Sequence, residues 1–549
     1  MKSKNLKYIL ILIALSYVFF MFGNSLVSLT NPDEVFYTLS AKEMAEHNTW
    51  MTPILFNQPQ FEKPIFTYWL IRIGFIIFGG ATNFAARFFP ALFAMLGVLA
   101  VYFLSLLAFN NQKKAFISGL ILMSGGLYIG LARTVFTDMI FSVLILFSFV
   151  SFFWGYLNNA KKNLSLVLFF IFMALAVLTK GPLGFLIPFL AVVIFLLIRK
   201  EVKYLFSKSV AWGVLLFILI SFPWYILMFQ KYGAAFIQEF FVNDHIRRLL
   251  EAEHLSNDTW YFYPFSMFGC TAPWSLFTAV SLFFLFKNVK DKARPAYLFL
   301  ACWIGVVFLI FQPAHSKLVS YIFPMFAALA VVCGDFIYNT AFLEQKNRQF
   351  FVISLLSLAV FFLVPIGMEV AMQKFPGYLS SRLPVYVFIA LFSILLISAL
   401  RFILRYKFFK AVYVFAFIVP AFIFMVPFVC NDIEPYISSK YATKFLMKNY
   451  PVGDTILCSK FYVRGVRFYT GKDVAVFNMG AGNFFSPHPI PFLNQDQKVK
   501  DFLKIHPSIY CVLKKSAVKD IERIIAGEYK VTFLKQIGDE YLLKVDPVS

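Results

Sequence analysis

The sequence has little charge for its length. Only 14% of its 549 residues are charged and 60% are hydrophobic, whereas a soluble domain has about 25% charged and about 45–50% apolar residues. The mean hydropathy of +0.74 agrees with this imbalance. The net charge of +22 does not require a nucleic-acid partner, because membrane proteins place Lys and Arg in cytoplasmic loops and beside anionic lipids. The composition therefore indicates a polytopic membrane protein that contacts membrane lipids and no nucleic acid.

Cysteine pairs and nucleotide-binding motifs are also missing. The six cysteines are scattered, and no CxxC pair suggests a metal or redox site. Cys458 and Cys511 fall in a polar C-terminal segment, where they leave room for one disulfide. The chain has no Walker motif and no GxGxxG, so ATP or a soluble nucleotide sugar is not the expected donor.

Long apolar runs are abundant, and about thirteen of them are long enough to span a bilayer. The first follows a basic N-terminus without a nearby A-x-A-like site, which favours an uncleaved signal anchor. The "TKGP" at 179–182 splits a longer run, because Gly and Pro do not easily continue a helix. The predicted spans cover residues 8–29, 84–108, 115–131, 138–157, 164–179, 183–198, 208–229, 263–286, 295–312, 318–338, 350–371, 384–400 and 411–429.

The loops between these runs alternate in charge. One set, including "NNQKK", "NNAKKN" and "KNVKDKAR", is short and basic, so we expect it to face the cytoplasm. The other set holds most of the acidic residues of the membrane half and should face outward. This alternation predicts a cytoplasmic N-terminus and, with an odd number of spans, an external C-terminus.

Two of the outward loops are long, at residues 30–83 and 230–262. Their segments "FYTLSAKEMAEH" and "GAAFIQEFFVNDHIRRLL" have helical spacing of apolar residues, which is typical of helices that lie in the interface plane. A surface of this kind suits an amphiphilic substrate.

The C-terminal segment has a different composition. "GDTILCSKFYVRGVRFYTGKDVAVFN" predicts a strand, a short helix or strand, and a strand. "PSIYCVLKKSAVKDIERIIAGEYKVTFLKQIGDEYLLKVD" predicts a strand, a helix and a hairpin. We therefore expect two domains, a membrane domain at 1–431 and an external α/β domain at 432–549, and the second shows no convincing site of its own.

Two motifs in the first outward loop carry carboxylates. Asp33, in "TNPDEVFYTLS", is either a helix N-cap or a carboxylate held beside a reacting group at the membrane surface; the two roles are compatible. In "NQPQFEKPIFTYWL", Pro64 favours an extended Lys63, so Glu62 and Lys63 should point to opposite sides. Lys63 then suits a lipid phosphate, and Glu62 can orient it or bind a metal ion; hydration by water is the plain alternative.

Further charges stand at the outward ends of predicted spans. Arg133 and Asp138 lie in "GLARTVFTDMIFSVL", where charges are costly and often mark a site, although a structural pair is the alternative. Lys180 precedes the Gly-Pro break, and a helix that begins there is suited to an anion. The position of all three on the outward side favours a site for a phosphate-bearing lipid.

The later motifs add bases and a phenol. "NDHIRRLL" contributes His245 and Arg247, and His245 can meet Glu62 on a shared metal. In "PAHSKLVSYIFP", Lys317 and Tyr321 are four residues apart, so a helix would place them on one face. Snorkelling and interfacial anchoring are the plain explanations for such a pair.

The order "DE…FEKP…D…LTKGP…PWY…FF…H…PW…SKL..Y..P" resembles bacterial lipid A aminoarabinose transferases across residues 1 to about 340. These belong to the GT-C class of membrane glycosyltransferases, with protein O-mannosyltransferases as relatives. The resemblance implies transfer of a sugar, an amino sugar in particular, from undecaprenyl phosphate to a lipid A phosphate. It further implies an enzyme of the bacterial inner membrane with a periplasmic C-terminal domain, acting as a monomer in lipopolysaccharide modification.

The resemblance also implies roles for particular residues. Asp33 would be the principal catalytic carboxylate and Asp138 a second, Lys63 a ligand of the donor phosphate, and Glu62 with His245 a pair that holds a divalent metal such as zinc. Tyr37, Lys317 and Tyr321 would line the pocket. One departure is Gln60, which stands where the family often has an aromatic residue, and it puts the sugar contacts in doubt rather than the reaction. A relative that moves galactosamine or mannose would look much the same.

Two other functions compete with lipid A glycosylation. A protein O-glycosyltransferase would use a Ser or Thr acceptor and would need Asp33 as a base. A flippase or transporter of lipid-linked sugars would place its charges near the midplane of broken helices, whereas here the charges lie at the outward ends of the runs.

Overall fold

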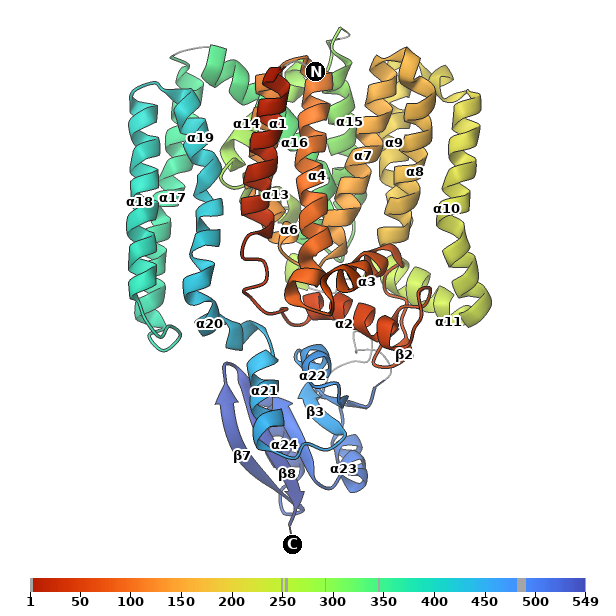
Figure 1. Ribbon diagram of the computed structural model, residues 1–549, viewed down its shortest axis with the longest axis vertical. Coiled ribbons are helices and arrows are strands. Elements are labelled where there is room, and N and C mark those ends of the chain that lie inside the picture. Colours follow the sequence, from red (N-terminus) through yellow and green to blue (C-terminus); the bar gives the residue numbers. More distant parts are fainter. Residues whose placement is uncertain are drawn as a thin grey trace.

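The computed structural model describes residues 3–247, 250–251, 255–291, 293–343, 346–480 and 490–548. It consists of a helical bundle with the small C-terminal domain packed against one end (Figure 1). The N-terminus lies at the opposite end of the bundle (Figure 1). We call the end that carries the C-terminal domain the domain end.

Seven helical stretches of the described chain are long and apolar enough to cross a membrane. Two further pairs qualify only if each bent pair counts as one span: α5 with α6, bent by 66°, and α13 with α14, bent by 117°. The protein is therefore a multi-pass membrane protein, and the count of thirteen spans stays a prediction. The seven are α4 Asn83–Phe109, α7 Thr137–Leu157, Asn159–Lys180 with α8 Lys162–Lys180, α10 Lys208–Tyr232, Val319–Leu343 with α16 Phe326–Ile337, α17 Arg348–Lys374 and α18 Leu383–Leu404.

Shorter helices account for the other predicted spans. Each predicted run contains helix, but several helices are broken or too short to cross alone. The run at 263–286, for example, forms two helices around a sharp bend. These elements are α1 Ser3–Ser16 with the π-helix η1 Tyr17–Met21, α5 Gln112–Ser124, α6 Gly126–Ala132, α9 Leu183–Arg199, α13 Phe262–Cys270, α14 Ser275–Asn288, α15 Pro295–Phe311, the 3₁₀-helix η6 Val319–Met325, the π-helix η7 Tyr338–Leu343, α19 Phe408–Ile418 and α20 Val426–Ile437.

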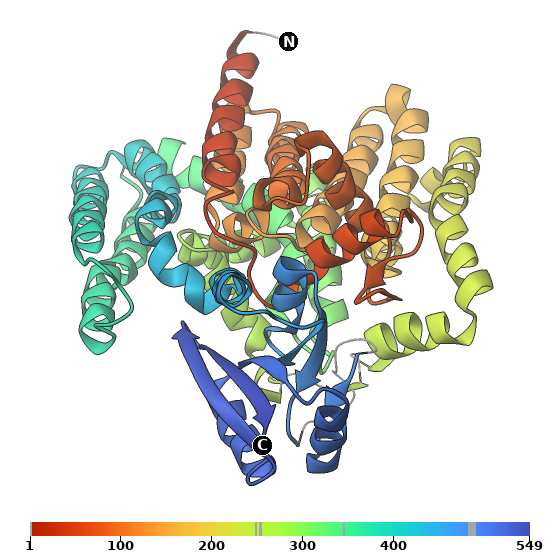
Figure 2. The same cartoon turned by 60° about the horizontal axis from the view of Figure 1, so that its bottom comes forward.

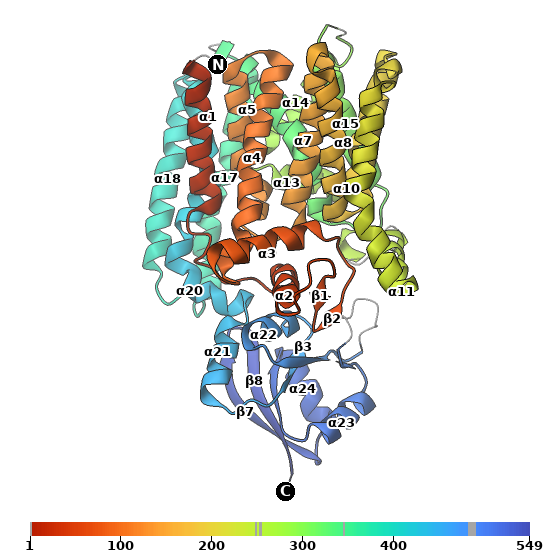
Figure 3. The ribbon, with the colours of Figure 1, turned by 45° about the vertical axis from the view of Figure 1, so that its right-hand side comes forward.

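The two outward loops fold over the domain end of the bundle. The first contains α2 Asp33–Glu46, the two-stranded hairpin β1 Ile54–Leu55 and β2 Gln58–Pro59, and α3 Phe66–Phe78, which lies across the ends of the long helices (Figure 3). The second contains α11 Ala234–Phe236 and the π-helix η4 Ile237–Arg247. The expected helix of the first loop is thus present as α2, but it is buried along most of its length instead of lying on a lipid surface.

The C-terminal domain is a six-stranded sheet in the order β5-β4-β3-β6-β8-β7. Strands β3 to β6 are parallel, and β8 and β7 form an antiparallel hairpin at one edge. The predicted order of elements is confirmed, with helix α22 in the position left open between strand and helix. The elements are α21 Lys440–Asn449, β3 Thr455–Ser459, α22 Val463–Thr470, β4 Asp473–Phe477, β5 Phe492–Leu493, α23 Asp496–Ile505, β6 Ile509–Leu513, α24 Lys515–Ile524, β7 Tyr529–Ile537 and β8 Glu540–Pro547.

The structure adds two details to the predicted domain organisation. The predicted boundary between 431 and 432 falls inside α20, because this helix continues from Val426 to Ile437 before the chain turns at Ser438. Cys458 and Cys511 lie on the neighbouring strands β3 and β6, and both are free thiols. No disulfide therefore joins these two strands.

The C-terminal domain shares a hydrophobic core with the first outward loop. Residues of α2 and α3 and residues of α22, β3 and β4 belong to one buried cluster, and α22 lies beside α2 (Figures 1 and 3). Arg467 of α22 anchors this contact through an ion pair with the buried Glu43 of α2, with 2.8 Å between Nε and Oε1. Viewed from the domain end, the C-terminal domain covers the centre, between α17 and α18 on one side and α10 on the other (Figure 2).

Candidate functional site

A buried ion pair fixes the start of α2. Arg87 of α4 donates two hydrogen bonds to the carboxylate of Glu34, at 2.5 and 2.7 Å. The same carboxylate accepts bonds from Thr30 and from the backbone N–H of Val135. Glu34 is fully buried, so it serves to hold the loop on the bundle, and its neighbour Asp33 is left at the surface.

Asp33 is the first residue of α2, and Pro32 occupies the cap position before it. Its side chain is 62% exposed. The guanidinium of Arg464 lies 3.8 Å from its Oδ1. Asp33 is therefore an accessible carboxylate at the domain end of the bundle, in a position that a substrate can reach.

Glu62 and Lys63 have different partners, as the sequence predicted. The Lys63 ammonium donates to the carboxylate of Asp244 on η4 at 2.5 Å and to the carbonyl of Glu62 at 2.9 Å. The Glu62 carboxylate instead faces Arg464, at 4.0 Å. The side chains of Lys63 and Asp244 are only 13% and 9% exposed, so the two outward loops are joined by a largely buried ion pair.

A second ion pair joins the ends of two helices. Lys180, the last residue of α8, donates to Asp138 in the first turn of α7 at 2.5 Å. The Lys180 ammonium also lies 5.2 Å from the ring centre of Tyr321. The structure thus brings together three predicted site residues from three elements.

Tyr37 lies between these groups. It is buried, and its ring contacts those of Phe36 and Tyr68. Burial raises the pKa of Tyr37 well above its usual value, and the charges of Asp138, Asp33 and Glu62 add to that effect. Tyr37 therefore stays a neutral phenol that can donate a hydrogen bond in the middle of the site.

Arg464 completes the group from the C-terminal domain. Its guanidinium stacks on the ring of Phe36 at 4.6 Å and faces both Asp33 and Glu62. The structure therefore places a residue of the C-terminal domain, in which the sequence showed no convincing site, next to two predicted site residues. Composition did not reveal this residue, because only the docking of α22 on α2 gives Arg464 its neighbours.

Three of the predicted site residues have other partners. Arg133 donates to the backbone carbonyls of Phe19 and Phe22, so it caps the first helix and makes no hydrogen bond to the other site residues in the described part of the chain. Arg247 forms an ion pair with Glu251, one turn further along the chain. Lys317 donates to the carboxylate of Asp258 and to the carbonyl of Thr259, both at 3.2 Å.

The predicted helix face shared by Lys317 and Tyr321 is wrong. The 3₁₀-helix η6 begins only at Val319, and Lys317 precedes it. Lys317 is directed to Asp258, which His315 also contacts at 2.8 Å, whereas Tyr321 is beside Lys180. Lys317 therefore holds the end of the second outward loop against η6.

The predicted metal site at Glu62 and His245 receives no support from the described residues. The side chain of His245 lies outside them, and within them no three His, Cys, Asp or Glu side chains gather as metal ligands. The Glu62 carboxylate has a guanidinium 4.0 Å away. The metal at Glu62 and His245 therefore stays a prediction.

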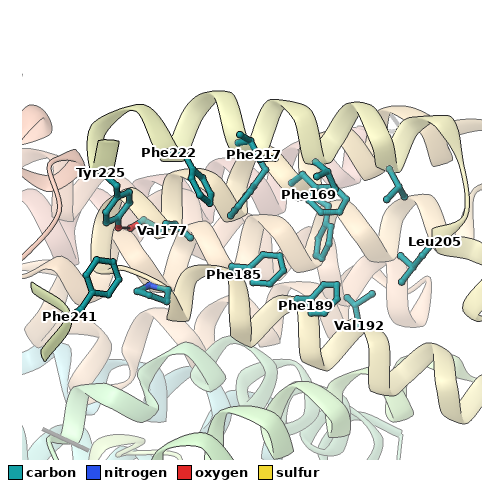
Figure 4. Close-up of a pocket in the computed structure, with 15 residues that line it drawn as sticks. Phe169, Val177, Phe185, Phe189, Val192, Leu205, Phe217, Phe222, Tyr225 and Phe241 are labelled. Carbon is teal, nitrogen blue, oxygen red and sulfur yellow. Dashed lines mark hydrogen bonds between the residues drawn. The ribbon is translucent and has the colours of Figure 1, made fainter. Parts of the chain in front are cut away.

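An apolar groove leads to the cluster of charges. It has a volume of about 660 Å³ and is lined by α8, α9, α10 and the start of η4 (Figure 4). Only Tyr225 among its lining residues carries a polar group, and that hydroxyl donates to the carbonyl of Val177. Pro182, two residues after Lys180, and Phe241, three residues before Asp244, both line the groove.

Sequence reasoning missed Arg87, Asp244 and Arg464 as parts of this arrangement. Asp244 had a usable signal, since it lies beside His245 in a loop already singled out. The sequence carried no such signal for Arg87 or Arg464. Each is one of many basic residues, and its partner is known only from the packing.

Comparison with known proteins identifies relatives of the chain. The profile of the dolichyl-phosphate-mannose-protein mannosyltransferase family matches residues 5–236. The chain is 31% identical over 334 residues to an undecaprenyl phosphate-aminoarabinose transferase of Proteus mirabilis, covering 59% of each protein. It is also 30% identical over 363 residues to an uncharacterized protein of Aquifex aeolicus, covering 65% of this chain and 70% of that one. The chain is therefore similar to aminoarabinose transferases over about three fifths of its length, and its N-terminal part matches the mannosyltransferase profile.

Solved structures share this fold. ArnT from Cupriavidus metallidurans bound to undecaprenyl phosphate superimposes with a TM-score of 0.78 at 18% identity, covering 98% of both chains. An oligosaccharyltransferase of Archaeoglobus fulgidus gives a TM-score of 0.56 at 13% identity, covering 98% of this chain and 74% of that one. These likenesses show the fold. The chain spans only about 59% to 61% of the named transferases of Proteus mirabilis and Shewanella sediminis.

Proposed function

We propose that this protein transfers a sugar, an amino sugar in our expectation, from undecaprenyl phosphate to a phosphate of lipid A. The observation that carries the proposal is the position of Lys63 and Lys180 beside the groove, with the exposed Asp33 at the same end of the bundle. A polyprenyl chain needs an apolar groove, and its phosphate needs cations at the end of that groove.

The residues support a dissociative transfer. Breaking the anomeric C–O bond of the donor gives the sugar oxocarbenium character, which a carboxylate at Asp33 stabilises. Negative charge grows on the leaving phosphate, and Lys63 and Lys180 are the cations that we assign to receive it. A phosphate acceptor is already anionic at neutral pH, so it needs positioning more than deprotonation.

Both lysines have an acidic partner that the donor phosphate must share. Lys63 is paired with Asp244 and Lys180 with Asp138. An ion pair of this kind keeps each ammonium in place and compensates its charge before substrate arrives. The phosphate would then join the pairs, and Asp138 would act by holding Lys180 as well as by its own charge.

The orientation in the membrane follows from the same assignment. We place the N-terminus in the cytoplasm and the C-terminal domain in the periplasm of the bacterial inner membrane, and we expect a monomer. The short basic loops of the sequence support this orientation, and so does the location of the N-terminus and the C-terminal domain at opposite ends of the bundle.

Mass spectrometry of lipid A tests the proposal. Cells that make the donor would be compared with and without the protein, and with Asp33→Asn. We expect a mass increment on lipid A that requires the protein and falls at least about 100-fold with Asp33→Asn, since loss of an electrostatic transition-state contact has effects of that order. Asp454→Asn removes a fully exposed carboxylate of the C-terminal domain and should leave the increment unchanged.

A second candidate function is protein O-glycosylation, because the matching family profile is that of protein mannosyltransferases. An unchanged lipid A spectrum together with sugar on periplasmic protein would contradict the lipid A acceptor and support this alternative. The size of any increment would identify the sugar.

A further inference from the structure

We propose that Arg464 of the C-terminal domain binds the phosphate of the acceptor lipid, so that the domain supplies one wall of the acceptor site. This inference rests on the proposed function. It assigns a role to the C-terminal domain and a ligand, a phosphate monoester on a lipid, to a residue outside the membrane bundle.

The first argument is the state of the guanidinium. Arg464 is only 17% exposed, yet it donates no hydrogen bond within 3.5 Å to any of the residues that the structure describes. Its two nearest carboxylate oxygens, on Asp33 and Glu62, are 3.8 and 4.0 Å away. Charge-assisted hydrogen bonds are shorter, about 2.7–2.9 Å, so the guanidinium keeps its donors available while the carboxylates offset its charge.

Arg467, one turn further along α22, makes the contrast clear. Its guanidinium bonds to Glu43 at 2.8 Å, to Asp473 at 2.9 Å and to the carbonyl of Gly471 at 3.1 Å. Arg467 therefore has a structural role, because its N–H groups donate hydrogen bonds within the protein. Two arginines on one helix therefore differ in a way that docking alone does not explain, since Arg467 already secures α22 on α2.

The second argument is how firmly Arg464 is positioned. The Cζ atom of the guanidinium lies 4.6 Å from the centre of the Phe36 ring, a cation–π contact that helps to hold the planar fork in place. The next residue, Gly465, packs so closely on Asn31 that a Cβ atom there would overlap its side-chain oxygen. A glycine at this point brings α22 directly against the turn that precedes Asp33, and a planar fork fixed in that way suits bidentate binding of phosphate.

The third argument is the arrangement of the cations around Asp33. Lys63 and Lys180 belong to the side of the site that adjoins the groove. The groove is lined by Phe241, three residues before Asp244, the partner of Lys63, and by Pro182, two residues after Lys180. Arg464 approaches Asp33 from the C-terminal domain. A transfer between two phosphates needs a cation for each, and the lysines are placed for the donor while Arg464 is placed for the acceptor beside the carboxylate that steadies the sugar.

The test uses the full-length protein in lipid nanodiscs and three measurements. Binding of lipid A, binding of lipid A from which the phosphates have been removed, and binding of undecaprenyl phosphate would be measured for the wild type and Arg464→Gln. We expect Arg464→Gln to weaken the phosphate-dependent part of lipid A binding by about tenfold or more, the usual size of a charge-assisted bond, and to leave undecaprenyl phosphate binding unchanged. In the transfer reaction the loss should appear as a higher KM for lipid A.

Two further variants separate binding from folding. Arg464→Lys keeps the charge without the fork and should recover part of the affinity. Arg523→Gln removes an arginine of the same domain whose side chain is 61% exposed and pairs with Asp496, and it should match the wild type.

The outcomes distinguish this inference from the proposed function. If the wild type binds lipid A through its phosphates and Arg464→Gln binds equally well, the inference is wrong and the proposed function stands. If Arg464→Gln loses affinity for undecaprenyl phosphate instead, Arg464 is a donor ligand and the acceptor assignment is overturned. Absence of phosphate-dependent lipid A binding by the wild type would contradict both.

Discussion

The inner layer of the domain end, around Glu34 and Arg87, differs from the rim, around Asp33, Glu62 and Arg464. In the inner layer a buried carboxylate and a buried guanidinium form a two-pronged pair, and three further donors from Thr30 and Val135 complete the shell. At the rim the same two kinds of group stand 3.8 to 4.0 Å apart. Charges that satisfy one another hold a fold together, whereas charges kept apart leave room for a ligand.

The adjacent positions of Asp33 and Glu34 show how close these two roles come in the sequence. Both belong to the first turn of α2, yet one side chain is 62% exposed and the other is fully buried. Because successive helical residues point about 100° apart, one carboxylate enters the bundle while its neighbour faces outward. The burial of Glu34 thereby fixes the position of Asp33.

Breaking the inner pair should have the largest effect on stability. Arg87→Leu leaves the Glu34 carboxylate buried without its cation, and removal of one partner of a buried pair costs about 3–5 kcal/mol. We expect a lower unfolding temperature and a lower yield of folded protein in detergent, measured by fluorescence and size-exclusion chromatography.

Asp33→Asn is the matched control for that loss. It changes an exposed carboxylate of the same turn and should shift the free energy of unfolding by less than about 0.5 kcal/mol. Equal stability of Arg87→Leu and Asp33→Asn would contradict the division into an inner layer and a rim.

Glu540 sharpens the comparison as a buried carboxylate without an arginine. It accepts a hydrogen bond from Ser439 at 2.6 Å, and burial raises its pKa from 4.5 to about 8. Between these values the folded protein holds a proton that the unfolded chain has released, so stability should fall as pH rises, by at most about 1.4 kcal/mol per pH unit.

The variant Glu540→Gln keeps the shape and removes the titration. Its stability should depend less on pH between about 5 and 8 than that of the wild type, and it should be the more stable protein at pH 8. Thermal unfolding across this range measures the difference. If the stability of the two proteins depended on pH in the same way, the protonation of Glu540 would not change on folding.

Asp244→Asn should give the smallest effect, on donor binding. Asp244 holds the Lys63 ammonium at 2.5 Å, and a donor phosphate must compete with that carboxylate. We expect the variant to bind undecaprenyl phosphate a few-fold more tightly, on the order of 1 kcal/mol, and Lys63→Gln to bind it more weakly. Weaker binding by both variants would mean that the main effect of Asp244 is to position Lys63, and that its competition with the donor phosphate for Lys63 matters less.

Much of the candidate site could be predicted because charge is rare in this chain. Asp33, Lys63, Asp138 and Lys180 stood out against apolar surroundings, and the structure gathers them at one end of the bundle. The same argument also selected Arg133 and Lys317. Arg133 binds backbone carbonyls, and Lys317 binds a carboxylate of the second outward loop. Rarity indicates that a charge has a partner, but it does not tell whether that partner is the protein or a substrate.

The sequence by itself determined the membrane class, the helical runs and the order of strands and helices in the C-terminal domain, because hydropathy and periodicity act over short stretches of chain. Only the tertiary structure decided which charges meet. Lys63 and Asp244 are 181 residues apart, and Arg464 reaches Asp33 only through the packing of α22 on α2. Such contacts depend on how whole helices pack, and for that reason the site, unlike the fold class, had to be found in three dimensions.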